Sequence, residues 1–239
     1  MTTVEVVREV CLTATPADAA MPVPDWVGAG RRAPVGTAVE VAPGVHLTAA
    51  PADEALAELP VPDWAEREAR AMSPRRAREY LAVRALYVRL MSEVDGTASP
   101  LHRTERGKPV VPGRPGLRVS LAHSDDVVAV ALAHGRDVGV DVQDAGLPGP
   151  AMLRRCCPGE AGRMAAEPAA GGRDFARVWA AQEACVKATG QGIAGRPWRI
   201  PVTAAAPAGR WRDLTWTQLR DRGSTFALCC AYADRTEGR

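Results

Sequence analysis

Two segments of the sequence combine charged side chains with a regular hydrophobic spacing that would hold those charges in fixed positions. The first is Val138–Gln143, where valine alternates with other residues in the manner of a half-buried strand. The valines would enter the core, and Asp141 would share the opposite face with Gln143 and with Gly139, beside which another group could approach closely. Asp141 is therefore a candidate for chemistry that needs a fixed carboxylate. The alternative is a solvated aspartate at the end of a strand.

The second segment is a predicted helix with two aromatic and two charged residues along one stripe. The residues of this stripe are spaced four apart, so they lie above one another on the helix: Phe175, Trp179, Glu183 and Lys187. The change from aromatic to charged side chains indicates that the stripe leaves the core and enters a polar environment. Glu183 and Lys187 are therefore candidate site residues. The alternative is a surface ion pair that contributes only ~0.3–0.5 kcal/mol.

Three further segments bring potential cations and one hydroxyl group. They are a helix expected over residues 73–91, begun by a capping serine and a proline, a Gly-Lys-Pro turn at 107–109, and a His-Ser pair after a strand. Their candidate binding residues are Arg75, Arg76, Arg84, Lys108, His123 and Ser124. Taken singly, such a histidine is more often structural, and such a turn usually leaves its lysine in water.

The elements that must position these residues indicate an α+β fold. Strands are expected at 118–122, 127–133 and 137–143, with a turn at His134-Gly135 between the last two. Asp174 is expected to cap a helix that runs from Phe175 to about residue 189 and ends at Gly190. The tail alternates in the manner of strands at 214–219 and 225–232. Each half therefore has one long helix and several strands.

The bulk properties exclude several classes of protein. The chain has 239 residues, 46% of them hydrophobic, and a net charge of only +2, which does not require a nucleic-acid partner. It has no apolar run long enough for a membrane span and no signal-peptide pattern, so a cytoplasmic protein is expected. The six cysteines form no C-x-x-C pair, which argues against zinc.

A segment at 11–26 recurs at 46–64, and residues 1–40 are interpreted as an N-terminal extension.

Taken in order, the motifs resemble those of the 4′-phosphopantetheinyl transferase superfamily, in its longer, Sfp-type branch. That branch has a G-K-P turn, a strand ending in S-H-S, a strand of the form [VI]-G-[VI]-D-[VI]-E and a helix of the form W-x-x-K-E-[AS]-x-x-K. The corresponding residues here are Gly107–Pro109, Ala122–Ser124, Val138–Gln143 and Trp179–Lys187. The resemblance extends from about residue 45 to 232. It implies two similar α+β halves related by a pseudo-twofold axis, each a small antiparallel sheet with one long helix, expected at 41–130 and 131–239 with a cleft between them.

The resemblance also implies a reaction. A carrier-protein serine would attack the β-phosphorus of coenzyme A, take up the 4′-phosphopantetheine group and release adenosine 3′,5′-bisphosphate. Asp141 and Glu183, with Gln143, would hold Mg²⁺, which commonly takes one or two carboxylates and completes its shell with phosphate oxygens and water. Glu183 could also orient or deprotonate the serine, and Lys187 would meet the phosphates. Lys108, His123 and Ser124 would bind coenzyme A, and Arg75, Arg76 and Arg84 are candidates for its 3′-phosphate.

Three positions depart from the family pattern, and one of them, Ala122 in place of a hydroxyl residue, is a minor change. Gln143 stands where the family has a second strand carboxylate, and Gln182 stands where it has a lysine expected beside the diphosphate. Gln182 is nevertheless kept as a candidate coenzyme A contact. The departures leave two hypotheses: an ordinary transferase, or a repurposed relative that binds coenzyme A or a carrier-bound substrate and does different chemistry. The resemblance implies a monomer acting on an acyl or peptidyl carrier protein, in polyketide or nonribosomal peptide synthesis, and the composition suggests a high-GC bacterium.

Overall fold

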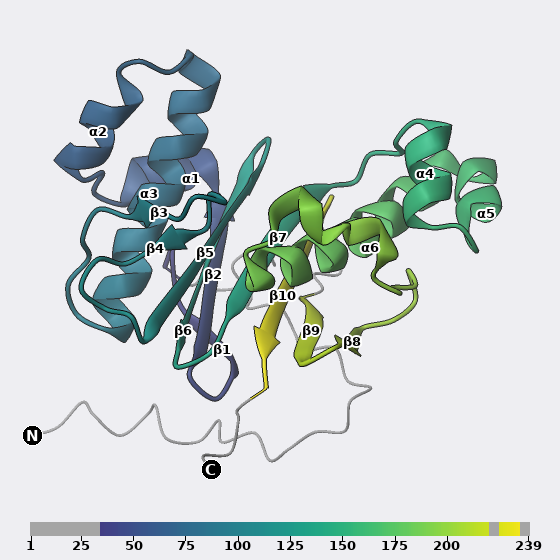
Figure 1. The fold of residues 1–239 in the computed structure, drawn as a ribbon. Helices are drawn as coiled ribbons and strands as arrows, with labels where there is room; N and C mark the ends of the chain where they lie inside the picture. The colour runs from purple at the N-terminus through teal and green to yellow at the C-terminus, as the bar shows by residue number, and fades with distance from the viewer. Residues whose placement is uncertain (1–33, 220–224, 235–239) are drawn as a thin grey trace, which may run out of the picture.

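The computed structural model describes residues 34–219 and 225–234, so the first copy of the repeat, at 11–26, lies outside the described residues. Figure 1 shows four layers, in which two sheets lie between two groups of helices. The expected α+β class is confirmed. No helix within the described residues is both long enough and apolar enough to cross a membrane.

The first half is a six-stranded antiparallel sheet with the order β1-β2-β6-β5-β4-β3, covered on one face by three helices. The strands are β1 Val39–Ala42, β2 Val45–Pro51, β3 His102–Arg103, β4 Pro109–Val110, β5 Leu117–Ser124 and β6 Val127–His134. The helices are α1 Ala52–Glu58, α2 Asp63–Ala69 and α3 Pro74–Val94. Ser73 stands at the N-cap of α3 as expected, but its side chain makes no capping hydrogen bond.

The second half is a four-stranded antiparallel sheet with the order β7-β10-β9-β8. Its strands are β7 Val138–Asp144, β8 Ala208–Trp211, β9 Leu214–Leu219 and β10 Phe226–Ala233. Its helices are α4 Pro150–Cys156, α5 Ala161–Ala166 and α6 Pro168–Thr189, followed by the 3₁₀ turns η1 Gly192–Gly195 and η2 Pro197–Arg199. The four layers therefore run from α3 through the two sheets to α6.

The two halves share one topology apart from two additional strands, β1 and β3, in the first half. In each half a strand, β2 or β7, is followed by two short helices and a long helix, and the half ends with two antiparallel strands, of which the last pairs with that first strand. The change from one half to the other lies at the turn at residues 135–137, where Gly135 has a φ of 71°. β6 extends to His134, so this turn comes later than the boundary expected at residue 131.

Helix α6 begins earlier than the sequence pattern predicts. It starts at Pro168 rather than Phe175, and Asp174 lies inside it, where its carboxylate pairs with Arg163 at 2.7 Å instead of capping the helix. The glycines in its first turns are packing residues, since a Cβ on Gly171 would lie 2.0 Å from the carbonyl oxygen of Met164. The predicted end is confirmed: Gly190 follows α6 with a left-handed φ of 67°.

Three apolar clusters lie between the layers, and a fourth, smaller one joins α2 to α3. One lies between α3 and the first sheet, and another between α6 and the second sheet. The third lies between the two sheets and contains residues of both halves, among them Val45, Ala129, Val140 and Leu228. Because this middle cluster is shared, each half covers the inner face of the other.

Candidate active site

A cleft of about 430 Å³ lies where the first strand of the second half passes β5 and the end of α6. The second half contributes Asp141 and Gln143 from β7 and Trp179, Glu183 and Lys187 from α6. The first half contributes Arg76 and Arg84 from α3, His123 from β5, and Arg103, Arg106 and Lys108 from the β3–β4 hairpin. The cleft is therefore lined by carboxylates and one lysine on one side and mainly by cations on the other.

The alternation of β7 positions Asp141 as the sequence predicts. Val138 and Val140 are fully buried in the cluster between the sheets, whereas Asp141 and Gln143 line the cleft. The group that approaches Gly139 is helix α6 itself, because a Cβ at this position would lie 2.0 Å from the carbonyl oxygen of Ala184. Gly139 thus lets α6 pack directly on β7, which brings the stripe of α6 beside Asp141.

Asp141 and Lys187 form a close ion pair at the floor of the cleft. The ammonium of Lys187 lies 2.6 Å from Oδ1 of Asp141 and 3.4 Å from the carbonyl oxygen of Leu121 on β5. Burial raises the pKa of Asp141, while the charge of Lys187 and its hydrogen bond act in the opposite direction. Through its contact with Leu121, Lys187 links the second half to the first.

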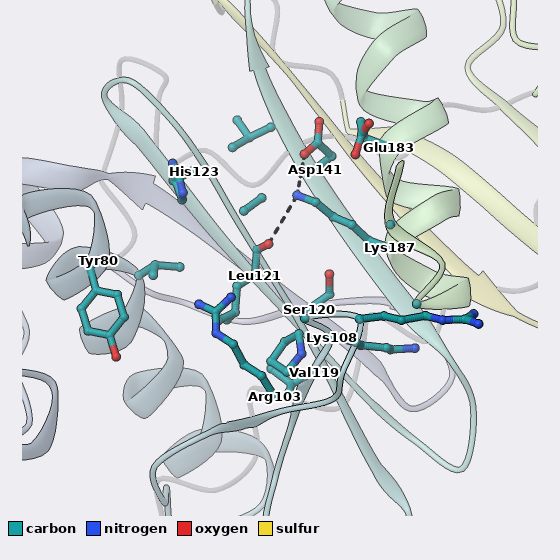
Figure 2. Close-up of a pocket in the computed structure, with 18 of the residues that line it drawn as sticks. Tyr80, Arg103, Lys108, Val119, Ser120, Leu121, His123, Asp141, Glu183 and Lys187 are labelled. Atoms are coloured by element: carbon teal, nitrogen blue, oxygen red, sulfur yellow. Dashed lines mark hydrogen bonds and ion pairs between the residues drawn. The ribbon is translucent and has the colours of Figure 1, made fainter. Parts of the chain in front are cut away.

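Glu183 lies one helical turn before Lys187, on the same side of α6 (Figure 2). Burial raises the pKa of Glu183, the neighbouring charge of Asp141 raises it further, and Lys187 partly offsets both effects. The effect of Asp141 on Glu183 places the two carboxyl groups in one electrostatic environment. A turn earlier, Trp179 lines the cleft and stacks on Phe175 with ring centroids 6.2 Å apart. The predicted stripe of α6 therefore does pass from the core into a polar cleft.

The opposite wall contains a network around the buried carboxylate of Glu79 on α3. Arg76 lies 3.7 Å from Glu79, and Nδ1 of His123 lies 3.3 Å from it. Nη1 of Arg76 also lies 2.7 Å from Nε2 of His123. Burial lowers the pKa of His123, and although Glu79 opposes this effect, Arg76 and Lys187 add to it. Glu79 thus orients two potential phosphate ligands at the rim of the cleft.

Arg84 is the most deeply placed cation of this wall. It is 5% exposed, its guanidinium lies 4.3 Å from the ring centroid of Tyr80, and its Nε has no hydrogen-bond partner among the described residues. Burial lowers the pKa of Arg84. Arg103 and Arg106 stand nearby on the hairpin and were missed by the sequence reasoning, because two-residue strands have no periodicity that would show where their side chains point.

Lys108 lines the cleft, but its ammonium is already engaged. It lies 2.8 Å from Asp137 in the turn between the halves and also donates a hydrogen bond to the carbonyl oxygen of Ala188 at the end of α6. Lys108 therefore fastens the β3–β4 hairpin to the second half. A phosphate contact by this lysine would require it to exchange one of these partners.

Three of the predicted binding residues lie elsewhere. Arg75 and Ser124 line an adjoining hollow of about 690 Å³, where Arg75 pairs with Asp125 and the hydroxyl of Ser124 donates to Asp144 at the end of β7. Gln182 is fully buried, and its amide donates to the carbonyl oxygens of Cys156 and Ile200, each at 3.1 Å. The expectation that Gln182 lies beside the diphosphate is therefore wrong: its side chain points away from the stripe and joins α6 to α4 and η2.

Comparison with known protein families gives two matches, one for each half. The family model for the 4′-phosphopantetheinyl transferase N-terminal domain matches residues 65–133, and that for the 4′-phosphopantetheinyl transferase superfamily matches residues 137–230. The gap between the two matches coincides with the turn that separates the halves. No curated protein matches the chain in sequence.

Proposed function

Because the chain belongs to the 4′-phosphopantetheinyl transferase superfamily and its two halves fit the Sfp-type branch, we propose that it transfers the 4′-phosphopantetheine group of coenzyme A to a serine of an acyl or peptidyl carrier protein. The other product would be adenosine 3′,5′-bisphosphate. The observation that carries the proposal is the division of the cleft, in which the carboxylates of β7 and α6 face the arginines of α3 and of the hairpin. Transfer from a diphosphate ester needs cationic side chains that neutralise the charge of the phosphates. It also needs groups on the other side that position the attacking hydroxyl.

The cationic wall would bind the phosphates of coenzyme A. Arg76 and His123 stand together at the rim, and Arg84 offers a buried guanidinium that lacks a partner at Nε. Since an uncompensated buried charge is costly, an anionic ligand at Arg84 would gain more than one at an exposed arginine. Arg84, Arg76 and His123 are therefore the proposed ligands of the 3′-phosphate. Arg75 is less suited, because it lines the adjoining hollow and pairs with Asp125.

The donor set of the cleft fits a magnesium ion that is shared with the substrate. Asp141 and Glu183 are close enough for Asp141 to raise the pKa of Glu183, and Gln143 adds an amide oxygen. The described residues contain no group of three or more acidic, histidine or cysteine side chains that could hold a metal ion, so this part of the chain does not supply a complete set of ligands. Two carboxylates together with phosphate oxygens and water are a usual arrangement for Mg²⁺. When bound, the ion would neutralise charge on the diphosphate.

Glu183 and Lys187 would assist the transfer itself. Glu183 would accept the proton of the carrier serine, directly or through a water molecule, and its raised pKa favours this role near neutral pH. The ammonium of Lys187 would stabilise negative charge on the phosphoryl oxygens, for which it is placed one helical turn from Glu183. The serine oxygen forms a bond to the β-phosphorus as the bond from that phosphorus to the bridging oxygen breaks.

One observation keeps the second hypothesis in place, namely that Gln143 brings no charge to a wall where the family has a carboxylate. A repurposed relative would bind coenzyme A or a carrier-bound substrate but would not transfer the arm. The buried position of Gln182 weakens this hypothesis, because the glutamine there changes no contact within the cleft.

The decisive experiment is mass spectrometry of unmodified carrier proteins incubated with the enzyme, coenzyme A and Mg²⁺. A panel from fatty-acid, polyketide and nonribosomal peptide synthases should include at least one carrier that gains the mass of one phosphopantetheine group. The gain should disappear when the carrier serine is replaced by alanine. If no carrier gains mass although coenzyme A binds, the repurposed relative is the better description.

A further inference from the structure

The ion pair between Asp141 and Lys187 bears on how a metal ion could enter the cleft. Lys187 places a cation 2.6 Å from Oδ1 of Asp141, so one of the two cleft carboxylates is already neutralised by the protein itself. The side chain of Lys187 is 31% exposed, and its second contact, with the carbonyl oxygen of Leu121, is long at 3.4 Å. The ammonium is thus held mainly by Asp141 and has space in which to move.

The remaining groups offer little to a free metal ion. Gln143 contributes no charge, and within the described residues no cluster of three acidic, histidine or cysteine side chains exists that could replace it. Glu183 is then the single cleft carboxylate without an ion pair among the described residues, while Arg76, Arg84 and Arg103 face it from the other wall. A divalent cation would enter a region whose fixed charges are mostly positive.

We propose that the free protein binds its divalent metal only weakly, and that the metal binds tightly only together with the diphosphate of coenzyme A. In this exchange Lys187 leaves Asp141 and pairs with a phosphate oxygen, so that Asp141 becomes free to bind the metal. The inference rests on the proposed function for the identity of the diphosphate. Its basis is electrostatic: the diphosphate supplies the negative charge that the position of Gln143 lacks, and Mg²⁺ characteristically takes part of its shell from substrate phosphates.

The test is a titration of the full chain with Mn²⁺ at pH 8, in which free Mn²⁺ is measured by electron paramagnetic resonance. Coenzyme A should raise the affinity for Mn²⁺ by about 5- to 150-fold, the usual range for coupling between two ligands. A titration without protein corrects for metal held by free coenzyme A. Adenosine 3′,5′-bisphosphate, which lacks the diphosphate, should raise the affinity much less. By reciprocity, Mn²⁺ should tighten the binding of coenzyme A by the same factor.

Two matched variants test the part played by Lys187. Lys187→Gln should raise the Mn²⁺ affinity of the coenzyme-free protein on the order of tenfold, because it removes a positive charge from the immediate surroundings of Asp141. Lys108→Gln removes the same charge from the same cleft, but Lys108 pairs with Asp137, so its Mn²⁺ affinity should stay at the wild-type value. Gln143→Glu should also raise the affinity, by adding a carboxylate.

Two results would overturn the inference. One is a wild-type protein that binds Mn²⁺ as tightly without coenzyme A as with it. This comparison uses the wild type alone, so it does not depend on whether a variant folds. The other is a Lys187→Gln protein, folded by circular dichroism, whose metal affinity equals that of Lys108→Gln. These outcomes are separate from the transfer assay. If the protein modifies carriers but binds Mn²⁺ equally tightly without coenzyme A, only the inference is refuted. If coenzyme A raises the Mn²⁺ affinity but no carrier is modified, only the proposed function is refuted.

Discussion

Replacing Gly139 with alanine should damage both the stability and the activity of the protein. The added Cβ would lie 2.0 Å from the carbonyl oxygen of Ala184 and 2.5 Å from the amide nitrogen of Ala188. Both atoms belong to the backbone of α6, so no side chain can rotate to make room. To restore ordinary contact, α6 would have to move from β7 by roughly 1.5 to 2 Å, since non-bonded atoms pack at about 3.5–4 Å.

The expected size of the effect follows from this overlap. Overpacking of a core typically costs about 1–3 kcal/mol, and the rigid backbone of α6 puts Gly139→Ala at the upper end of that range, near 3 kcal/mol. For a chain of this size such a loss lowers the melting temperature by about 6–12 °C. Because α6 carries Glu183 and Lys187 and β7 carries Asp141, the same shift should reduce the rate of transfer by roughly 100-fold.

The assay is urea unfolding followed by circular dichroism, together with the mass-shift assay for transfer. Gly116→Ala is the matched control, because a Cβ at Gly116 has no neighbour within 4 Å and its φ is not in the left-handed region. The control should stay within about 0.5 kcal/mol of the wild type. If Gly139→Ala unfolds at the same urea concentration as Gly116→Ala, the close packing of α6 on β7 does not position the site.

Three other substitutions test the site. Glu183→Gln should abolish transfer yet raise the urea midpoint at pH 8, because burial raises the pKa of Glu183 and its ionised form therefore costs folding free energy above that raised pKa. The gain should fade as the pH falls through that raised pKa and should be absent below 4.5, the ordinary pKa of the group, where the carboxyl is protonated in both states; a gain that persists there would have another cause. Gln182→Lys should lower the midpoint without faster transfer, because it buries an ammonium away from the cleft, and a faster enzyme would contradict that placement. Arg84→Met should weaken coenzyme A binding by about 10- to 100-fold in calorimetry, the loss expected for a charged hydrogen bond; an unchanged Kd would remove Arg84 from the binding site.

The parts of the site that the sequence could predict are those set by a single element. The alternation of valines places Asp141 opposite the core, and the four-residue spacing of Trp179, Glu183 and Lys187 places them on one stripe, because strand and helix geometry alone decide these relations. The same geometry argues against Gln182, which is one residue from Glu183 and therefore turned about 100° away around the helix. The family motif assigns a role to the position of Gln182 by its place in the sequence and does not take account of this direction.

The parts that could not be predicted depend on contacts between distant segments. His123 and Ser124 are neighbours on β5 and therefore point to opposite faces, and only the fold shows that Ser124 binds Asp144 of β7 while His123 reaches the cleft. Arg103 and Arg106 reach the cleft through the pairing of β3 with β4. The sequence pattern did not predict the early start of α6, because glycines usually indicate a loop. Here Gly171 and Gly172 lie within the helix and allow neighbouring backbone to pack closely against it.

The apolar cluster between the two sheets also limits how the enzyme can move during turnover. Rotation of one half away from the other would expose residues such as Val45, Val140 and Leu228, which are at most 1% exposed. The cost of exposing them, about 25 cal/mol for each Å² of apolar surface, disfavours a hinge between the halves. Substrates must therefore enter and products leave past a static wall, through rearrangement of side chains and of the short β3–β4 hairpin. Product release should thus depend on breaking local ion pairs such as that of Lys108 with Asp137, and not on domain opening.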